Sequence, residues 1–326
     1  MDITIINGRV LLPDGTLTEA AVGIEDGCVA TVTDTPPTNG ARFWDAGGGL
    51  VLPGMVDLHG DAFERQLMPR PEAPFPVDMA LMETDRQLIA NGITTAYYGI
   101  TYSWEPGLRG RGHVVAIMDT MEALRTRFHC DTRVHMRWEL FNLAAEDEVA
   151  AWLAGGRIDL LAATAREHGI VMASHDDETP EMRRRYNGVG CTLCEFPLDR
   201  ATADASNELG DPIILGAPNV VRDGSHCDRL HAATSVSEGR CHILTSDYFY
   251  PSMLQAVFIL IDRGHADLAT AWRLVSTTPA KAAGLGDRGE IAAGRRADIV
   301  VIDDSHPGLP RVKGTFVAGR AIHSGH

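Results

Sequence analysis

Short segments in which apolar and polar residues alternate occupy both ends of the chain. Such alternation is typical of half-buried strands, and the turn pairs Asn7-Gly8 and Asp26-Gly27 between the N-terminal segments favour hairpins. The segments are ITIINGRVLL and AAVGIEDGCVATV near the start and GEIAAGRRADIVVID and VKGTFVAGRAIH near the end. The pattern predicts one small β-sandwich domain formed from both chain termini, residues 1–52 and 286–326.

The middle of the chain, residues 53–285, alternates short β-branched apolar runs with helical stretches, which is the pattern of βα units around a parallel sheet. Eight such strands fit a closed (β/α)8 TIM barrel better than an open sheet. The predicted strands span residues 55–59, 93–101, 133–140, 157–161, 170–175, 190–196, 212–217 and 241–247.

The fourth and fifth predicted strands lie unusually close together in the chain. Only residues 162–169 separate them, whereas a parallel crossover needs roughly a dozen residues or more. Either one of the two strand predictions is wrong, or the chain lacks a segment near Leu160 to Ala162. We favour a lacking segment, which would also remove any ligand or lid residue that it carried.

Composition narrows the class of protein. The 326 residues carry a formal net charge of -15, which argues against broad binding to nucleic acid or to an anionic membrane, because both need a positive face. The chain has no run of roughly 18 apolar residues and no signal-peptide pattern at its start, so we expect a cytoplasmic location. We expect reduced cysteines, with Cys191 and Cys194 packed in a strand rather than bound to metal.

Ligand-type side chains recur where predicted barrel strands end, which is the edge that carries the active site in such barrels. They are His59 and Asp61 after the first strand, Glu139 after the third, His175, Asp176 and Asp177 after the fifth, Glu195 after the sixth, His226 after the seventh and Asp247 after the eighth. Taken singly, each could be a turn residue, a salt-bridge partner or a helix N-cap. Their occurrence together indicates a metal site.

Imidazole and carboxylate groups that converge on a barrel mouth suit one or two divalent ions, zinc first, with manganese or iron as alternatives. Such a site activates water for hydrolysis. We expect the metal to be held by His59, Asp61, Glu139, His175 and Asp247, with Glu195, His226 and Asp176 as additional ligands or supporting residues. Asp247 is the predicted catalytic base. The histidines inside strands, His135 and His242, are interpreted as packed or inward-facing without a role in the site.

These residues lie within runs that resemble a known family. LVLPGMVDLHGDAFE looks like the entry to the barrel in the amidohydrolase superfamily, and GEIAAGRRADIVVID looks like its C-terminal β return. Within that superfamily the chain is similar to the phosphonate-metabolism branch. The runs that carry this resemblance are PRPEAPFP, RVHMRWEL, ASHDDET, GAPNVVRDGSH and LTSDYFYPSML.

The resemblance implies hydrolysis of α-D-ribose 1-methylphosphonate 5-triphosphate to the 5-phosphate and pyrophosphate. Many superfamily members carry His-x-His after the first strand, whereas this chain has His59-Gly60-Asp61, which the branch shares. The branch also carries Asp-His and a long insertion after the fourth strand. Both are absent here, at the place where the crossover is too short.

A triphosphate substrate needs cationic partners, and arginine suits bidentate phosphate contact. Arg70, Arg137 and Arg222 lie in the matched runs and are the predicted phosphate-binding residues, whereas the run Arg183 to Arg185 is interpreted as a solvated helix face. The expected partner is thus a small anionic phosphorylated sugar, with homodimerisation as a superfamily expectation. Two alternatives stay open: an amidohydrolase acting on a cyclic amide, N-acyl amide or lactone, and a non-catalytic metal-binding barrel.

Overall fold

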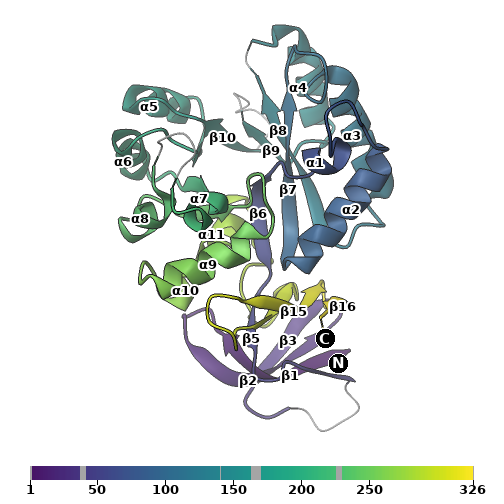
Figure 1. The fold of residues 1–326 in the computed structure, drawn as a ribbon, viewed down its shortest axis with the longest axis vertical. Coiled ribbons are helices and arrows are strands. Elements are labelled where there is room, and N and C mark those ends of the chain that lie inside the picture. The colour runs from purple at the N-terminus through teal and green to yellow at the C-terminus, as the bar shows by residue number, and fades with distance from the viewer. Residues whose placement is uncertain (1, 37–41, 140, 163–169, 225–229, 326) are drawn as a thin grey trace.

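A computed structural model describes residues 2–36, 42–139, 141–162, 170–224 and 230–325 of the chain (Figure 1). It consists of a parallel barrel and a separate sheet that contains both termini. The barrel strands are β6 (Met55–Gly60), β7 (Ile93–Tyr102), β8 (Asp131–Trp138), β9 (Leu160–Ala162), β10 (Val171–His175), β11 (Leu193–Glu195), β12 (Ile213–Gly216) and β13 (Ile243–Thr245). They pair in sequence order, and the ladders between neighbouring strands from β6 to β13 are parallel. The predicted barrel of eight strands is confirmed.

Helices surround the barrel on the outside, as in a βα succession. They are α1 (Glu64–Leu67), α2 (Val77–Ala90), α3 (Arg111–Leu124), the short 3-10 helix η1 (Leu143–Ala145), α4 (Glu146–Ala154), α5 (Pro180–Gly188), α6 (Arg200–Leu209), α7 (Ala217–Val221), α8 (Ala232–Ser237), α9 (Ser252–Asp262), α10 (Leu268–Arg273) and α11 (Thr277–Ala282). None of the described helices is long and apolar enough to cross a membrane.

The first and last barrel strands meet at the mouth. The amide N–H of Asp247 donates to the carbonyl of His59, and that of Asp61 donates to the carbonyl of Asp247, both at 2.9 Å. Below them, the buried carboxylate of Asp57 accepts from the amide of Ser246 at 3.0 Å and from its hydroxyl at 2.5 Å. These bonds close the barrel between β6 and β13 and bring two of its strand ends together.

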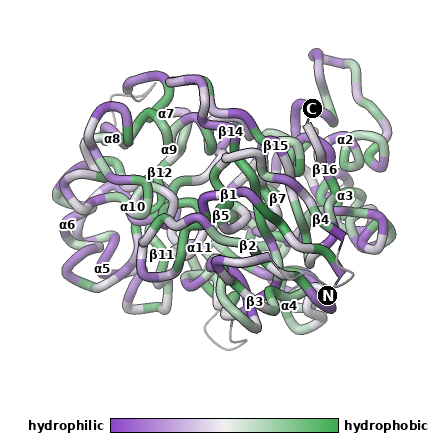
Figure 2. The backbone as a smooth tube through the Cα atoms, turned by 90° about the horizontal axis from the view of Figure 1, so that it is seen from below, coloured by the Kyte–Doolittle hydropathy of each residue, from purple (hydrophilic) through white to green (hydrophobic). Residues whose placement is uncertain are grey.

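Both chain termini contribute to one second sheet, as the terminal alternation predicted. Its order is β16-β15-β14-β5-β1-β2-β3, with β4 paired to β1. The strands are β1 (Ile3–Leu11), β2 (Leu17–Glu25), β3 (Cys28–Thr33), β4 (Arg42–Asp45), β5 (Leu50–Pro53), β14 (Ile299–Asp303), β15 (Arg311–Val317) and β16 (Arg320–Ser324). In the view from below, its strands cross the centre, with α5, α6, α8 and α10 on one side and α2 and α3 on the other (Figure 2). The domain boundaries at residues 52/53 and 285/286 stay a prediction.

Strand β14 connects the terminal sheet to the barrel because its side chains alternate between two faces. Ile299 and Val301 belong to a core inside the sheet, whereas Val300 and Ile302 belong to the large core shared with the barrel helices. Successive side chains of a strand point to opposite faces, so one face of β14 packs within the sheet and the other packs against the barrel.

The fourth and fifth predicted barrel strands are both present, as β9 and β10, and the connection between them is short. Val171 of β10 pairs with Leu160 of β9 in parallel register, so neither strand prediction is wrong, although β9 begins three residues later than predicted. Only residues 163–170 lie between them, and residues 163–169 lie outside the described residues. We still interpret the short connection as the result of a segment that this chain lacks between β9 and β10.

One prediction about surface charge is wrong. Arg184 and Arg185 of α5 are exposed, but Arg183 is fully buried. Its guanidinium pairs with Asp177 at 3.1 Å and with Asp211 at 3.2 Å. Of the three arginines, only Arg183 faces inward from the helix. A buried arginine needs charged or polar partners, and the local sequence does not reveal that such partners lie nearby in the fold.

Candidate active site

A cavity of about 230 Å³ opens at the carboxyl ends of the barrel strands. Its lining comes from the ends of β6, β8, β10, β11, β12 and β13, from the loops that follow them and from the loop after β7. The lining residues are His59, Asp61, Arg109, Arg137, His175, Asp176, Phe196, Pro197, Leu215, Asn219, Leu230 and Asp247. The cavity therefore lies where active sites lie in this type of barrel.

The backbone bends sharply where three of these strands end. Asp176, Phe196 and Asp247 follow β10, β11 and β13 and adopt positive φ angles of 58°, 53° and 54°. Aspartate tolerates this left-handed region, but for phenylalanine it costs roughly 1–2 kcal/mol. Strained residues of this kind cluster at functional sites, and here they leave the sheet at the mouth of the barrel.

Two carboxylates at the mouth are shifted toward the protonated form. Burial, reinforced by the negative charge of Asp61, raises the pKa of Asp247 to about 7. Burial also raises the pKa of Asp61, although Arg137 and Arg109 oppose that rise. Arg137 Nη1 lies 4.0 Å from an Asp61 oxygen. A carboxylate with a pKa near neutrality is suited to accept or hold a proton.

His59 is oriented from below by a buried carboxylate. Its Nδ1 lies 3.4 Å from Glu195 Oε1, and both side chains are almost completely buried. If this nitrogen donates, Nε2 keeps its lone pair. Carboxylates that fix the tautomer of a ligand histidine in this way are common in metal sites. Burial, followed by the positive charge of Arg137, lowers the pKa of His59 well below its usual value.

The described residues contain one group of three whose ligand atoms all lie within 4.8 Å of one another: His59, His135 and Glu195, all buried. We call it the buried cluster. His135 was predicted to have no role in the site, and its place in this cluster was not expected. A signal was available: His135 is two residues before Arg137 on β8, and the alternation of side chains along a strand places both on the same face.

The predicted site residues are brought together in part. His59, Asp61, Asp176, His175 and Asp247 all line the mouth cavity. Nδ1 of His175 lies 3.2 Å from Asp176 Oδ2, and its ring is 5.4 Å from that of His59. The other predicted ligands lie elsewhere, and the roles of all of them stay predictions.

Three of the predicted metal ligands or supporting residues are not among the described lining. Glu139 follows the end of β8, where its amide donates to the carbonyl of Tyr102 at 3.1 Å. Glu195 lies beneath the cavity in the buried cluster. His226 lies outside the described residues. The alternative reading of Asp176 and Asp247 as helix caps is wrong, because Thr179 caps α5 and Pro251 precedes α9.

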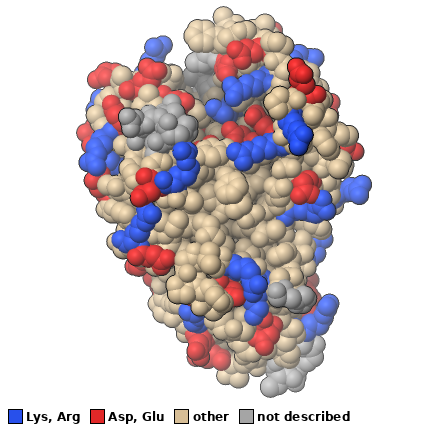
Figure 3. Space-filling view, in the orientation of Figure 1, with Lys and Arg blue, Asp and Glu red and all other residues tan. Residues whose placement is uncertain are grey.

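Of the three predicted phosphate-binding arginines, one is in the described lining of the cavity. Arg137 lines the cavity, Arg222 donates to the Tyr248 hydroxyl at 3.2 Å, and Arg70 is exposed after α1. The structure adds Arg109, which lies in the loop after β7 and lines the cavity. Sequence reasoning missed it because it belongs to no matched run. Figure 3 shows basic and acidic side chains close together over the upper, barrel part of the molecule.

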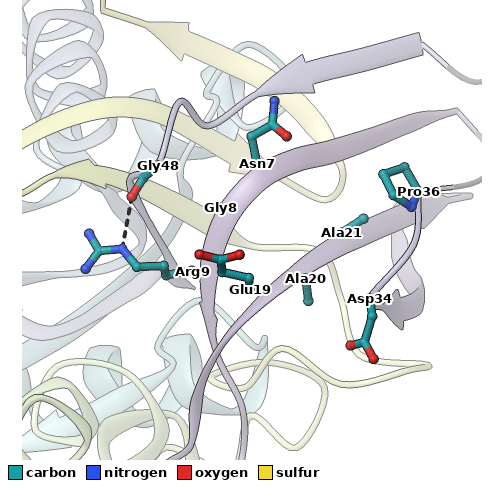
Figure 4. Close-up of a pocket in the computed structure, with 9 residues that line it drawn as sticks. All are labelled: Asn7, Gly8, Arg9, Glu19, Ala20, Ala21, Asp34, Pro36 and Gly48. Carbon is teal, nitrogen blue, oxygen red and sulfur yellow. Dashed lines mark hydrogen bonds between the residues drawn. The ribbon is translucent and has the colours of Figure 1, made fainter.

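A second cavity, of about 360 Å³, lies in the terminal sheet (Figure 4). Its arginine is already engaged: Arg9 donates to the Gly48 carbonyl at 2.9 Å and pairs with Asp304. Among the described residues no group of three metal-ligating side chains lines it. Catalytic chemistry is therefore better supported at the barrel mouth.

A family model and several relatives match the chain. A family model described as "Amidohydrolase family" matches residues 252–323. The chain is 26% identical to the alpha-D-ribose 1-methylphosphonate 5-triphosphate diphosphatase of Escherichia coli strain K12, over 91% of this chain and 94% of the relative. That alignment spans 361 residues, more than this chain contains, so the relative carries residues with no counterpart here.

Other relatives have different activities in their names. The chain is 29% identical to an adenine deaminase of Cereibacter sphaeroides over 93% of its own length, but it spans only 55% of that protein. Among solved structures it is similar to a dihydropyrimidinase from Brevibacillus agri. The TM-score is 0.73 and the identity 16%, and the match covers 99% of this chain and 95% of that one.

An N-acetylglucosamine-6-phosphate deacetylase from Pasteurella multocida has TM-score 0.74 and 12% identity, with coverage of 98% of this chain and 99% of that one. Identities this low show a shared fold alone. By the family match over residues 252–323 and the nearly full-length similarity to the diphosphatase, the chain is similar to hydrolases of the amidohydrolase superfamily and, among them, to the phosphonate-metabolism branch.

Proposed function

We propose that the chain is a metal-dependent diphosphatase that cleaves α-D-ribose 1-methylphosphonate 5-triphosphate to the 5-phosphate and pyrophosphate. The observation that carries the proposal is the presence of two arginines, Arg109 and Arg137, in the same cavity as Asp247. The protein as a whole has a net charge of -15, so cationic groups at the mouth favour an anionic substrate there. The similarity to the diphosphatase supports the same substrate class.

The side chains at the mouth fit a divalent ion. His59, Asp61, His175 and Asp247 offer the nitrogen and oxygen ligands that zinc, manganese and iron accept. We infer that these residues would hold such an ion. The chemistry it supplies when bound is Lewis-acid activation of water and of the phosphoryl oxygen.

The protein's own groups would divide the remaining work. Asp247, with a pKa of about 7, accepts the proton as water attacks the phosphorus next to the ribose 5-oxygen. The bond from that phosphorus to the bridging oxygen breaks, and pyrophosphate leaves. Arg137 and Arg109 neutralise charge on the phosphate oxygens, which is the main contribution a protein makes to phosphoryl transfer. Phe196, whose ring lies 5.2 Å from that of His59 and 5.1 Å from that of His175, limits the access of solvent to both imidazoles.

The test is pyrophosphate release from the triphosphate by metal-loaded protein, wild type against Asp247→Asn. Because a general base contributes roughly 10²–10⁴-fold, kcat should fall by at least about 100-fold in the variant. Asp204→Asn is the matched control, since Asp204 pairs with Arg240 on the surface, and it should retain full activity.

The same assay decides between the proposed activity and its alternatives. The assay also includes a panel of a dihydropyrimidine, a hydantoin, adenine and an N-acyl amino acid. These compounds represent substrate classes of the superfamily and of the named relatives. Turnover of a panel member with none of the triphosphate would overturn the diphosphatase proposal and leave an amidohydrolase or deaminase. Tight metal binding without turnover of any compound would point to a non-catalytic barrel.

A further inference from the structure

A fully buried guanidinium lies close to the mouth, and the chemistry proposed above makes no use of it. Arg183 of α5 and its partner Asp177 are both 0% exposed. Arg183 Nη1 donates to the Ser174 hydroxyl and to Asp177 Oδ2, the latter at 3.1 Å, and the Ser174 hydroxyl donates to the same carboxylate oxygen at 2.7 Å. Nη2 lies 3.2 Å from Asp211 Oδ2. One arginine therefore pairs with two carboxylates with little access to solvent.

Two partners of this arginine flank residues of the cavity. Ser174 directly precedes His175, and Asp177 directly follows Asp176, while His175 and Asp176 both line the mouth. Successive side chains of a strand point to opposite faces, so Ser174 faces α5 on the outer side of β10 and His175 faces the cavity. Arg183 therefore holds the turn at both of its ends without reaching the cavity itself.

Arg183 also binds the neighbouring strand. Its guanidinium donates to the carbonyl of Leu193 at 3.3 Å and to that of Cys191. Leu193 is the first residue of β11, and the residue after this strand is Phe196, whose ring lies 5.1 Å from that of His175. The same guanidinium thus links the two strands that carry the His175 ring and the aromatic ring packed against it.

Stability alone does not account for a buried arginine at this place. Burying a charge costs several kcal/mol, and apolar residues of similar volume often replace a buried ion pair without loss or with a gain of about 1–4 kcal/mol. The strand ends, in contrast, need restraint. Asp176 and Phe196 have positive φ angles of 58° and 53°, and such conformations persist only where the surrounding structure holds them in place. Hydrogen bonds on both sides of the Asp176 turn supply that restraint.

We propose that Arg183 is a positioning residue of the mouth, which acts through Ser174 and Asp177 to fix the place of the His175 ring. The proposal rests on the function proposed for the mouth, but not on the identity of the substrate. A displacement of about 1 Å at a reacting site can cost roughly 100-fold in rate. Loss of this support should therefore lower kcat. KM should change little, because Arg109 and Arg137, which would bind the phosphates, lie on or after other strands.

Variants on the two sides of the guanidinium separate positioning from a purely structural role. Ser174→Ala removes a partner on the side of the turn. Arg183→Lys keeps the charge but lacks the rigid fork that joins Ser174, Asp177 and β11 at once. Asp211→Asn removes a partner on the other side, where Asp211 precedes β12 and accepts from Asn187 of α5 at 2.9 Å. All three changes should lower the melting temperature, because each disturbs the same buried network.

The first measurement is steady-state pyrophosphate release from the triphosphate by zinc-loaded, full-length protein. We expect kcat to fall roughly 10–100-fold in Ser174→Ala and Arg183→Lys, with KM within about twofold of wild type. Asp211→Asn should keep kcat within about twofold although it is less stable. Arg184→Lys is the matched control for Arg183→Lys, because Arg184 is exposed and pairs with Glu208, and it should behave as wild type does.

The second measurement needs no turnover. In zinc-loaded protein labelled at the Cε1 carbon of histidine, the NMR signal of His175 is assigned by its absence in His175→Gln. This signal reports on the place of the ring beside Phe196. We expect it to shift or broaden in Arg183→Lys, which is eight residues away in the sequence, and to stay unchanged in Asp211→Asn and Arg184→Lys.

The two measurements distinguish failure of this proposal from failure of the proposed function. If kcat falls equally in Ser174→Ala and Asp211→Asn, in step with the lost stability, Arg183 has a structural role only and the proposal is overturned. An unchanged kcat together with an unchanged His175 signal in folded Arg183→Lys overturns it as well. If wild type does not cleave the triphosphate, the proposed function fails, and the His175 signal alone decides: a change confined to Arg183→Lys supports positioning, and no change overturns it.

Discussion

Some of the residues at and beneath the mouth could be predicted from the sequence and others could not. His59, Asp61, His175 and Asp247 stand directly at strand ends, and the rule that barrel sites form at carboxyl ends was enough to predict that they share a cavity. His135 is deeper in its strand, where an inward histidine and a packed histidine have the same sequence pattern. Only the approach of Glu195 from another strand distinguishes them.

Arg109 offers the sharpest test of substrate charge at this scale. It lines the cavity, and no ion pair or hydrogen bond to its side chain is present within the described part of the chain. We predict that Arg109→Gln lowers kcat/KM for the triphosphate by roughly 10–100-fold, because a hydrogen bond to a charged group contributes about 1.5–3 kcal/mol. Steady-state pyrophosphate release measures the change.

The matched control for this variant is Arg111→Gln. Arg111 is two residues away and is already paired with Glu148, so its replacement should leave kcat/KM within about twofold of wild type. Equal effects of the two substitutions would mean that Arg109 acts through the loop rather than on substrate. No effect of either would remove Arg109 from the phosphate-binding residues.

At the scale of elements, all eight barrel strands were predictable because each is a short β-branched apolar run bounded by turn residues. Their ends were not. The prediction extended the sixth and eighth strands to Phe196 and Asp247, whereas β11 and β13 end at Glu195 and Thr245. Phe196 and Asp247 themselves have left-handed backbone conformations, and a run of apolar residues in the sequence does not reveal where the backbone leaves the ladder.

Closure of the barrel between β6 and β13 depends on Asp57 and Ser246. The Asp57 carboxylate is fully buried and accepts the Ser246 hydroxyl at 2.5 Å. We predict that Ser246→Ala lowers the free energy of unfolding by about 1–3 kcal/mol, because a buried carboxylate oxygen loses its donor. Urea denaturation measures it.

Ser237→Ala provides the comparison for that measurement. The Ser237 hydroxyl is exposed and donates to the Thr234 carbonyl at the end of α8, so its loss should change stability by no more than about 0.5 kcal/mol. If Ser246→Ala is no more harmful than this control, the contact between Asp57 and Ser246 does not contribute to closure of the barrel.

The whole molecule is held together by an ionic network on the side of the barrel opposite to the mouth. Asp131, at the start of β8, accepts from Arg288 at 2.6 Å and from Arg296 at 3.2 Å. Both arginines precede β14 and connect the barrel to the terminal sheet. Neither contact was predictable, since the partners are more than 150 residues apart in the sequence and belong to different predicted domains.

This network gives the protein a pH-dependent stability. Burial by itself would raise the pKa of Asp131, but Arg133 and Arg288 outweigh it and hold that pKa below the usual value. The unfolded chain therefore binds a proton at Asp131 more readily than the folded one. The stabilising contribution is fully present above the unfolded pKa of about 3.9 and is lost as the pH falls through the lower folded value.

We therefore predict that the free energy of unfolding falls between pH 5 and pH 3, and that Asp131→Asn makes this fall shallower, because its side chain does not titrate. Urea titrations at several pH values in this window measure both slopes. Exposed Asp34 supplies the control, and Asp34→Asn should reproduce the wild-type slope. A slope in Asp131→Asn equal to that of wild type would show that other carboxylates carry the acid sensitivity, and that the contact between barrel and terminal sheet contributes equally at all pH values tested.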